Sequence, residues 1–309
     1  MIVDAKIAIT IRSFSATQLL SLSLRDIGEI SYINNTGKRL NEEDLCSILT
    51  NVEGVIAGTE KFTRRVFESS PNLRVISRVG TGIDNIDMEA ANEYGVSVMN
   101  TPNSPVLSVA EHTIALIFAV LKRIAIYNEN MRKNDYSVDS GFLLAGRIVG
   151  IIGLGRIGRK VAEMLEMLGC NIYYYDPFLP DDFSTKWIRM DKLNSLLQIA
   201  DIVTLHLPPL SEGKPIMSKK EFEHCKHDMI LINTSRGSLI DEDALAQAIE
   251  EDKIWGAGLD VFPVEPYSGK LLEYPQIVTT PHVASNTIES RQEMEKEAIS
   301  GLITKLRDL

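Results

Sequence analysis

Short runs of valine, isoleucine and leucine recur along the whole chain, and stretches with helical spacing separate them. The runs cover residues 6–11, 29–33, 54–58, 74–79, 96–100, 148–153, 171–176, 202–207, 229–235, 256–260 and 277–281. Nearly continuous apolar content predicts strands that are buried on both faces, as in a parallel sheet covered by helices. Strands that alternate with helices at this spacing indicate βαβ units, so we expect an α/β protein.

Two breaks interrupt this pattern. The chain has 309 residues, a length that suggests two domains. Two prolines fall within residues 101–105 (TPNSP), and Thr280-Pro281 forms a second break. The helix expected after the first break, Val106 to Ile126, is apolar on nearly every side, so its own domain or another subunit must cover it. The second break precedes a polar helix, Thr287 to Leu309.

Composition narrows the possible partners and compartment. The chain has a formal net charge of −10 and no run of lysine and arginine, so nucleic acid and anionic membranes are poor partners. Cys46, Cys170 and Cys225 lie far apart and form no CxxC pair, which fits a reducing cytoplasm and argues against a disulfide framework or a metal site. The N-terminus lacks a basic start followed by an apolar run, so no signal peptide is expected.

A glycine motif follows the strand that opens the second set of runs. Gly153, Gly155 and Gly158 form the pattern GxGxxG between RIVGII and the helix RKVAEMLEML, which is the context this motif requires. The first glycine suits a tight turn, the second lets backbone approach a pyrophosphate, and the third allows close packing of helix on strand. Free N–H groups at the start of the helix would then bind phosphate. A plain glycine turn is the alternative.

An acidic residue lies where a dinucleotide site needs one. Asp176 ends the next strand, 18 residues after Gly158. A carboxylate in this place can accept hydrogen bonds from both ribose hydroxyls of a dinucleotide, and it repels the 2′-phosphate of NADP. The glycine loop and this acid together predict NAD as the cofactor. The alternative is an aspartate that only caps the loop after the strand.

Three residues suited to the chemistry of a 2-keto acid follow late strands. Arg236 comes just after MILIN, Glu265 lies in the segment after GAGLD, and His282 follows IVTT. Because ligands bind beyond the carboxyl ends of parallel strands, we expect the three side chains to converge. Each residue alone has an ordinary explanation as a surface charge, a solvated carboxylate or a structural histidine. Their combination after a dinucleotide loop is what indicates catalysis.

Each of these residues has a role that follows from its chemistry. The planar guanidinium of Arg236 matches a carboxylate and can polarise the adjacent carbonyl. His282 can give a proton to the forming alkoxide, or take one from the hydroxyl in the reverse direction. Glu265, hydrogen-bonded to His282, would favour the imidazolium. The sequence therefore predicts hydride transfer between nicotinamide and the 2-carbon of a small 2-hydroxy or 2-keto acid.

These residues belong to an ordered series of motifs that resembles the D-isomer-specific 2-hydroxyacid dehydrogenases. The series is SRVGTGIDNID (77–87), NTPNSPVLSVAEHT (100–113), GIIGLGRIG (150–158), HLPP (206–209), INTSRGSLID (232–241), GLDVFPVEP (258–266) and TPHVAS (280–285). So many motifs in one order make the resemblance specific, and it covers nearly the whole chain.

The resemblance implies an architecture. It consists of two doubly wound parallel-sheet domains of the Rossmann and flavodoxin-like type, with a cleft between them. Residues 1–102 and 285–309 would form a discontinuous substrate-binding domain, and residues 103–284 an NAD-binding Rossmann domain with a dimerisation helix. A homodimer that acts on a small 2-hydroxy or 2-keto acid is implied as well.

The resemblance also assigns the site residues. Catalysis falls on Arg236, Glu265 and His282, and Asp260 would face the nicotinamide carboxamide. The expected cofactor contacts are Thr81, Gly153, Gly155, Arg156, Ile157, Gly158, Asp176, His206, Leu207, Pro208, Thr234, Ser235, Asp260 and Ala284. The expected substrate contacts are Arg78, Val79, Gly80, Arg236 and His282. Glu111 and His112 are expected to be structural, and His206 to shape the cofactor loop.

Within the family, the first two motifs resemble phosphoglycerate dehydrogenases most, but three features depart from that subgroup. Gly58-Thr59-Glu60 and residues 136–139 (YSVD) stand where arginines are frequent, and the chain ends at Leu309, so no C-terminal regulatory domain is expected. An unphosphorylated acid is therefore an open alternative substrate. An alternative function is an NAD(H)-sensing binding protein of the corepressor type, which shares the catalytic residues but has no significant turnover.

Overall fold

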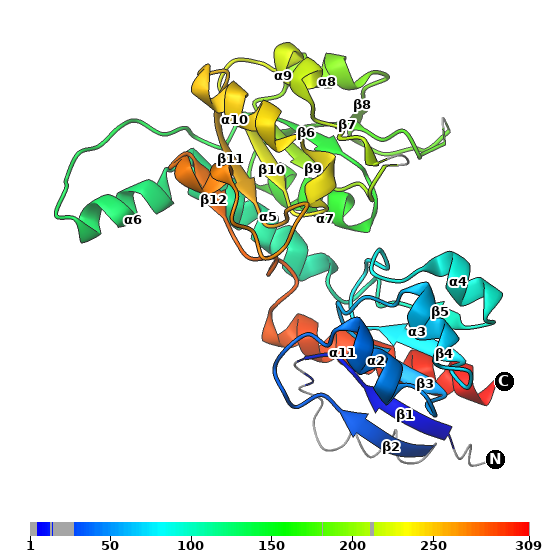
Figure 1. The fold of residues 1–309 in the computed structure, drawn as a ribbon. Helices are drawn as coiled ribbons and strands as arrows, with labels where there is room; N and C mark the ends of the chain where they lie inside the picture. Colours follow the sequence, from blue (N-terminus) through cyan, green and yellow to red (C-terminus); the bar gives the residue numbers. More distant parts are fainter. Residues whose placement is uncertain (1–4, 13, 15–27, 181, 211–212, 309) are drawn as a thin grey trace. The chain divides into compact units, whose positions relative to one another are not determined.

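The computed structural model describes residues 5–12, 14, 28–180, 182–210 and 213–308. The chain divides into two compact units, one formed by Met1–Pro105 with Asn286–Leu309 and the other by Val106–Ser285. Each unit is built on its own parallel sheet, and helices cover both faces of each sheet (Figure 1). The prediction of an α/β protein with two doubly wound parallel sheets is therefore confirmed.

The first unit contains a five-stranded sheet in the order β2-β1-β3-β4-β5, in which every neighbouring pair is parallel. This is the 2-1-3-4-5 order of flavodoxin-like folds. Its elements are β1 (Ala5–Ile9), β2 (Gly28–Ile33), α2 (Glu42–Ile48), β3 (Gly54–Ala57), α3 (Arg64–Glu68), β4 (Val75–Arg78), α4 (Met88–Glu93), β5 (Ser97–Met99) and α11 (Ile288–Arg307).

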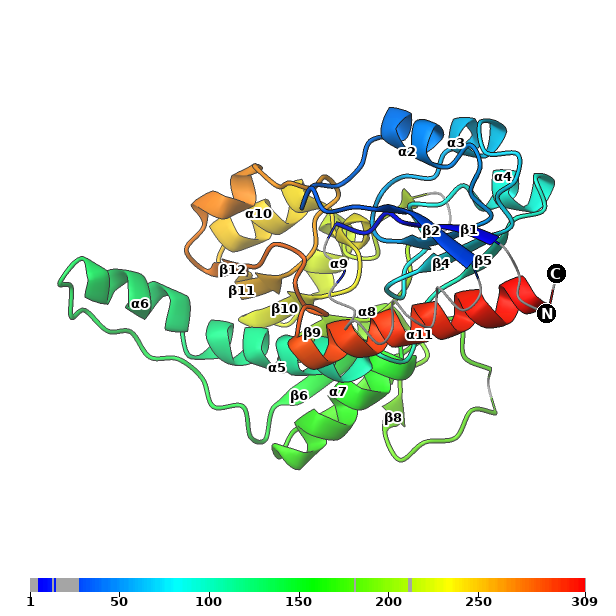
Figure 2. The ribbon, with the colours of Figure 1, turned by 90° about the horizontal axis from the view of Figure 1, so that it is seen from below.

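Two apolar layers hold this sheet. Helices α2, α3 and α4 cover one face, where Leu45 and Phe67 are buried, and α11 covers the other (Figure 2). Helix α11 begins after its N-cap Thr287, whose side chain accepts a hydrogen bond from the backbone N–H of Ser290. It buries Met294 and Leu302 against β3 and β4. The sequence therefore predicted this helix closely, although its expected last residue, Leu309, lies outside the described residues.

The second unit contains a seven-stranded parallel sheet in the order β12-β11-β10-β9-β6-β7-β8. The strand order reverses between β6 and β9, which is where doubly wound sheets bind ligands. Its elements are α5 (Val106–Leu121), α6 (Ile124–Arg132), β6 (Ile148–Ile152), α7 (Arg156–Met167), β7 (Asn171–Tyr175), β8 (Ile188–Arg189), α8 (Leu193–Ile199), β9 (Ile202–Leu205), α9 (Lys219–His224), β10 (Met229–Asn233), the 3-10 helix η2 (Gly237–Leu239), α10 (Glu242–Glu250), β11 (Ile254–Leu259), the 3-10 helix η3 (Lys270–Glu273) and β12 (Ile277–Thr279).

Helix α5 packs closely on the sheet of this unit. Helices α5 and α7 cover one face, and α8, α9 and α10 cover the other. A Cβ at Gly258 of β11 would lie 3.0 Å from Cβ of Leu116, so the absence of a side chain at Gly258 lets the helix approach the strand. The approach brings side chains of α5 near the ends of β10 and β12, which matters for the site described below.

The structure corrects two sequence predictions of secondary structure. The helix predicted over Val106–Ile126 ends at Leu121, because Arg123 has a left-handed backbone (φ 53°) and a separate helix, α6, starts at Ile124. The guanidinium of Arg123 lies 5.2 Å from the ring centroid of Trp255, and this contact accompanies the turn. Strand β8 was missed because its two residues form no apolar run. Among the described residues, no helix is long and apolar enough to cross a membrane.

Candidate active site

Three adjacent strands of the second unit lead into the residues predicted to be catalytic. Arg236 follows β10, Glu265 lies in the segment after β11, and His282 follows β12, and these strands are neighbours in the order β12-β11-β10 (Figure 1). Because all three strands run parallel, their carboxyl ends lie along one edge of the sheet. The predicted convergence at one sheet edge therefore has a direct topological basis.

His282 and Glu265 form a hydrogen-bonded pair. Nδ1 of His282 lies 3.0 Å from Oε2 of Glu265, while Oε1 of Glu265 accepts a hydrogen bond of 3.2 Å from the backbone N–H of Phe262. An ionised carboxylate only accepts hydrogen bonds, so Nδ1 carries the proton in this pair. The other ring nitrogen, Nε2, is then the atom that can exchange a proton with a ligand.

The backbone of His282 is held in an unusual conformation. Its φ angle is 54°, in the left-handed region that few residues other than glycine adopt. Its N–H donates to the carbonyl oxygens of Asp260 (2.8 Å) and Thr280 (3.0 Å). The two following N–H groups, of Val283 and Ala284, donate to the Asp260 carboxylate at 2.8 and 2.9 Å. Together these bonds fix the direction in which the imidazole leaves the loop.

Asp260 is the centre of this loop. Its side chain is fully buried, and Oδ1 also accepts a hydrogen bond of 2.6 Å from Oγ1 of Thr280. Burial raises the pKa of Asp260, but the hydrogen bonds from His112, Thr280, Val283 and Ala284 outweigh it, so the pKa lies below its ordinary value. Asp260 is therefore ionised at neutral pH and organises the His282 loop. Its expected contact with a nicotinamide carboxamide stays a prediction.

Arg236 lies on a loop that Asn233 closes. Nδ2 of Asn233 donates to the carbonyl oxygen of Arg236 (2.8 Å), and its Oδ1 accepts from both N (3.0 Å) and Oγ (2.9 Å) of Ser235. A Cβ on Gly237 would overlap the backbone of Phe262. The Arg236 loop thus packs directly on the segment that leads to Glu265.

The glycine loop has the geometry expected for a dinucleotide site. Gly153 has φ 94°, and a Cβ there would lie 2.7 Å from the carbonyl carbon of His206, while a Cβ on Gly158 would overlap the carbonyl oxygen of Gly153. A Cβ on Gly155 would meet no described atom within 4 Å, so there is open space beside this residue. Gly155 is also the N-cap of α7 and offers no side chain to its N–H groups. These features fit a pyrophosphate.

Asp176 connects the glycine loop to the end of β7. Its Oδ2 accepts a hydrogen bond of 2.7 Å from the N–H of Leu154, and Oδ1 accepts one of 2.8 Å from Phe178. Each carboxylate oxygen has a second lone pair for a ribose hydroxyl. Arg156, the first residue of α7, is exposed, and Ile157 packs partly against the core.

The loop after β9 faces the glycine turn. Nε2 of His206 lies 3.0 Å from Oγ1 of Thr204, and burial lowers the pKa of His206 to about 3. His206 is therefore neutral at physiological pH. Of the two residues that follow His206, Leu207 is buried and Pro208 is exposed to solvent.

The predicted substrate loop lies in the first unit, after β4. The N–H of Gly80 donates to Oγ1 of Thr101 (2.7 Å), and Nδ2 of Asn100 donates to the carbonyl oxygen of Thr81 (2.6 Å). Two motifs, around residues 77–87 and 100–103, thus meet in space. Gly80 has φ 129°, and a Cβ there would overlap the guanidinium of Arg78. The substrate role of Arg78, Val79 and Gly80 and the cofactor role of Thr81 stay predictions.

Comparison with known proteins agrees with this geometry. Residues 114–284 match the family model described as "D-isomer specific 2-hydroxyacid dehydrogenase, NAD binding domain". A hydroxypyruvate reductase of Thermotoga maritima is 33% identical over 279 residues, which is 88% of this chain and 90% of that protein. The chain belongs to the D-isomer-specific 2-hydroxyacid dehydrogenase family.

Other similar proteins of known name differ in length. A D-3-phosphoglycerate dehydrogenase of Methanocaldococcus jannaschii is 36% identical over 276 residues, covering 87% of this chain and 52% of that protein. The chain spans about half the length of the first curated relatives it matches. The crystal structure of the TT0316 protein from Thermus thermophilus has a TM-score of 0.88 and 29% identity, covering 98% of this chain and 97% of that one.

In this member of the 2-hydroxyacid dehydrogenase family, sequence reasoning missed several residues that build the site. Thr280 and Asn233 bind the loops of His282 and Arg236. Helix α5 contributes Ser108, which donates to the carbonyl oxygen of Ala284 (2.7 Å), and Thr113, whose Oγ1 is 2.9 Å from Oγ1 of Thr234. The available signal was the presence of polar residues in a helix that is otherwise apolar.

Proposed function

We propose that this chain is an NAD-dependent dehydrogenase that transfers a hydride between nicotinamide and C2 of a small 2-hydroxy or 2-keto acid. The observation that carries the proposal is the pair of His282 and Glu265, at 3.0 Å, on the sheet edge that also bears Arg236 and the glycine loop. Family membership and relatives named hydroxypyruvate reductase and D-3-phosphoglycerate dehydrogenase support it.

The residues of the chain divide the work of keto-acid reduction. Arg236 binds the carboxylate and draws electron density from the adjacent carbonyl oxygen. Bound NADH supplies the hydride that C2 accepts. His282 gives the proton from Nε2 to the carbonyl oxygen as it becomes a hydroxyl, and Glu265 stabilises the imidazolium before transfer. In the reverse direction His282 takes that proton back.

The glycine loop and Asp176 support NAD as the cofactor. The open space beside Gly155 suits the pyrophosphate, and the carboxylate of Asp176 suits the ribose hydroxyls. The proposal includes cofactor contacts by Thr81, Thr234, Ser235, Asp260 and Ala284. It includes substrate contacts by Arg78, Val79 and Gly80 as well.

The activity is tested by following NADH oxidation with a panel of 2-keto acids. The panel contains 3-phosphohydroxypyruvate, hydroxypyruvate, glyoxylate and branched keto acids, with Arg236→Ala as the control for carboxylate binding. The proposal expects saturable turnover of at least one acid and a rise in its KM of about tenfold or more in the control. Tight NADH binding without turnover of any acid would instead favour the NAD(H)-sensing alternative.

We also infer that the protein is a homodimer and that helix α6 and the segment after it form the contact. Helix α6 buries none of its residues in the described chain, and Figure 1 shows it projecting from the rest of the second unit. Helix α6 and the segment after it, up to residue 143, form an arm that carries exposed apolar side chains, namely Ile124, Met131, Tyr136, Val138 and Leu143. Apolar groups gathered on one projection are typical of a protein interface.

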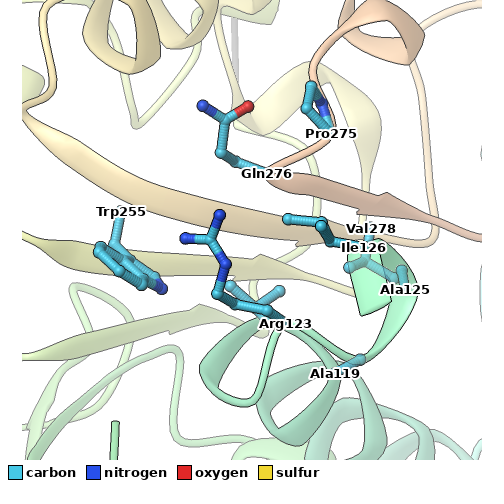
Figure 3. A pocket seen from close by; sticks show the side chains of 9 residues that line it. Ala119, Arg123, Ala125, Ile126, Trp255, Pro275, Gln276 and Val278 are labelled. Carbon is cyan, nitrogen blue, oxygen red and sulfur yellow. The ribbon is translucent and has the colours of Figure 1, made fainter. Parts of the chain in front are cut away.

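An open depression at the base of this arm, lined by Arg123, Trp255 and Gln276, supports a second copy as its partner. Figure 3 shows Arg123 beside Trp255, and Gln276 next to them with its carboxamide pointing away from Arg123. Within the described chain, Nε of Arg123 and Oε1 of Gln276 are buried without a hydrogen-bond partner. A donor and an acceptor left unpaired in one depression are costly unless another group binds them. We expect a partner's backbone or carboxamide group there.

Sedimentation of the purified protein tests the dimer. Tyr136→Ser combined with Val138→Ser removes two exposed apolar side chains, and we expect it to weaken the dimer by at least tenfold in its dissociation constant. Glu223→Ser, at an exposed position of helix α9, is the control on the same unit. A wild-type protein that sediments as a monomer would contradict the inference.

A cytoplasmic location is part of the proposal. Cys46, Cys170 and Cys225 are free thiols in the structure. Free thiols persist in reducing compartments, and burial raises the pKa of Cys170 to about 11 and that of Cys225 to about 12, so both stay protonated.

A further inference from the structure

We propose that His112 of helix α5 is a positioning residue for the reaction, acting through Thr280 and Asp260 on the backbone that carries His282. This inference rests on the proposed dehydrogenase function. It concerns a residue that sequence reasoning assigned to structure alone, and it gives helix α5 a part in the catalytic geometry.

The hydrogen bonds from His112 to the catalytic loop have a defined direction. Oγ1 of Thr280 lies 2.6 Å from Oδ1 of Asp260, and Nε2 of His112 lies 3.0 Å from the same Oγ1. Asp260 is ionised and only accepts, so the single hydroxyl proton of Thr280 points to the carboxylate. Nε2 of His112 must therefore carry a proton and donate it to Thr280. Nε2 also lies 3.5 Å from Oδ1 of Asp260.

The far end of this chain of hydrogen bonds is the backbone around His282. The Asp260 carboxylate accepts hydrogen bonds from the N–H groups of Val283 and Ala284. The carbonyl oxygen of Asp260 accepts one from the backbone N–H of His282. The left-handed conformation of His282 is unfavourable for an L-residue, so it persists only where its neighbours hold it. A shift of the carboxylate would move the peptide units that direct the imidazole toward Glu265.

Helix α5 holds the loop at a second point. Oγ of Ser108, one helical turn before His112, donates to the carbonyl oxygen of Ala284 at 2.7 Å. The loop of residues 280–284 is therefore bound to the helix at both of its ends. Because α5 is a rigid element packed on the sheet, it can fix the loop to the precision that proton transfer needs.

His112 does not itself reach the reacting atoms in this scheme. Its side chain is 22% exposed, and its Nε2 is engaged with Thr280. Among the described residues, Asp260, His112 and Glu265 contact this loop, while Arg236 follows the neighbouring strand β10. A substitution of His112 should therefore change the reaction only by moving the His282–Glu265 pair.

The test compares His112→Leu, which removes the donor, with His112→Gln, whose side-chain amide can still donate. Glu111→Gln, an exposed neighbour on the same helix, is the matched control. We expect His112→Leu to lower kcat for the best keto acid about tenfold, with unchanged dissociation of NADH measured by fluorescence. His112→Gln should recover most of kcat, and Glu111→Gln should resemble the wild type.

A double-mutant cycle separates the proposed route from a general loss of stability. If His112 acts through Thr280, Thr280→Val with His112→Leu should cost no more than the worse single variant. A purely structural role would lower the fraction of folded enzyme and leave kcat per active site unchanged, and additive effects would overturn the route through Thr280.

Hydrogen exchange tests the positioning by His112 without requiring that the protein turn over a keto acid. In a peptide covering residues 279–285, His112→Leu should raise the exchange rates of the amides of Val283 and Ala284 at least tenfold, whether or not the wild type turns over a keto acid. Unchanged exchange would overturn the inference. If the wild type turns over no keto acid but His112→Leu still exchanges faster, the positioning by His112 stands and only the proposed dehydrogenase function fails.

Discussion

Nδ1 of His282 lies 3.0 Å from Oε2 of Glu265, and the peptide N–H of the same histidine lies 2.8 Å from the carbonyl oxygen of Asp260. Two acidic residues thus hold one histidine, one at its ring and the other at its backbone. The first contact stabilises the charged ring, and the second fixes its direction. The proposed reaction needs both, because a proton donor must be charged and also aimed at the forming hydroxyl.

Substitutions at this pair should affect proton transfer before they affect cofactor binding. We expect His282→Ala to lower kcat for keto-acid reduction by about 10²–10⁴, the range of a lost acid–base group. Glu265→Gln keeps an acceptor for Nδ1 of His282 but removes the negative charge, so kcat should fall about tenfold. Steady-state rates of both variants and the wild type check this, and an unchanged kcat in Glu265→Gln would argue against the pair.

Two glycines of the dinucleotide loop should separate cofactor binding from folding. In Gly158→Ala the new Cβ overlaps the carbonyl oxygen of Gly153, so we expect a loss of about 2 kcal/mol or more in the free energy of unfolding. In Gly155→Ala the new Cβ meets open space, so stability should stay within about 0.5 kcal/mol. The dissociation constant of NADH should nevertheless rise about tenfold or more, because the methyl group takes the space of the pyrophosphate.

Urea denaturation and NADH fluorescence titrations measure these two effects. Unchanged affinity in Gly155→Ala would show that the pyrophosphate does not bind beside this residue.

Asp176 should determine the choice between the two nicotinamide cofactors. Its carboxylate repels a 2′-phosphate, so Asp176→Asn should raise kcat/KM with NADPH relative to NADH by at least about tenfold. The amide oxygen can still accept the hydrogen bond from Leu154, which preserves the glycine loop, while the amide nitrogen gives up the bond from the N–H of Phe178. The ratio of kcat/KM for the two cofactors is the measurement. A wild type that already prefers NADPH would contradict the assignment.

His206 should make folding stability depend on pH. Burial lowers its pKa from 6.5 to about 3, so between these values the unfolded chain binds a proton that the folded chain does not. The contribution of His206 to the free energy of unfolding is therefore complete above pH 6.5 and is lost as pH falls toward 3. Between pH 7 and pH 5 the loss amounts to about 2 kcal/mol.

The variant His206→Gln should lack this loss. We expect the difference in free energy of unfolding between pH 7 and pH 5 to be smaller in the variant by that amount, as measured by urea denaturation at both values. An equal pH dependence in the two proteins would show that His206 is protonated in the folded state.

The fold followed from local features of the sequence to a large extent. Buried parallel strands leave nearly continuous apolar runs, and glycines with positive φ or close contacts leave a motif of fixed spacing, as Gly153 and Gly158 do. Strand β8, with only two residues, and the turn at Arg123 leave no such trace. The turn is accompanied by a contact with Trp255, which is distant in sequence.

The candidate site was accessible from the sequence only in part. Arg236, Glu265 and His282 could be found because each follows a recognisable strand and has a side chain suited to proton or carboxylate chemistry. The residues that hold them could not. Thr280 and His112 act through hydrogen bonds across 168 residues of sequence, and no local pattern shows which polar residue of an apolar helix will meet a loop so far along the chain.

The most direct test of the proposed reaction follows one atom. Reduction of the best keto acid with NADH deuterated at both C4 positions of the nicotinamide, followed by mass spectrometry and NMR of the product, shows where the hydride goes. We predict one deuterium at C2 of the hydroxy acid, formed at a rate that falls by at least about 10² in His282→Ala. Saturable NADH binding with no deuterated product from any acid of the panel would contradict it.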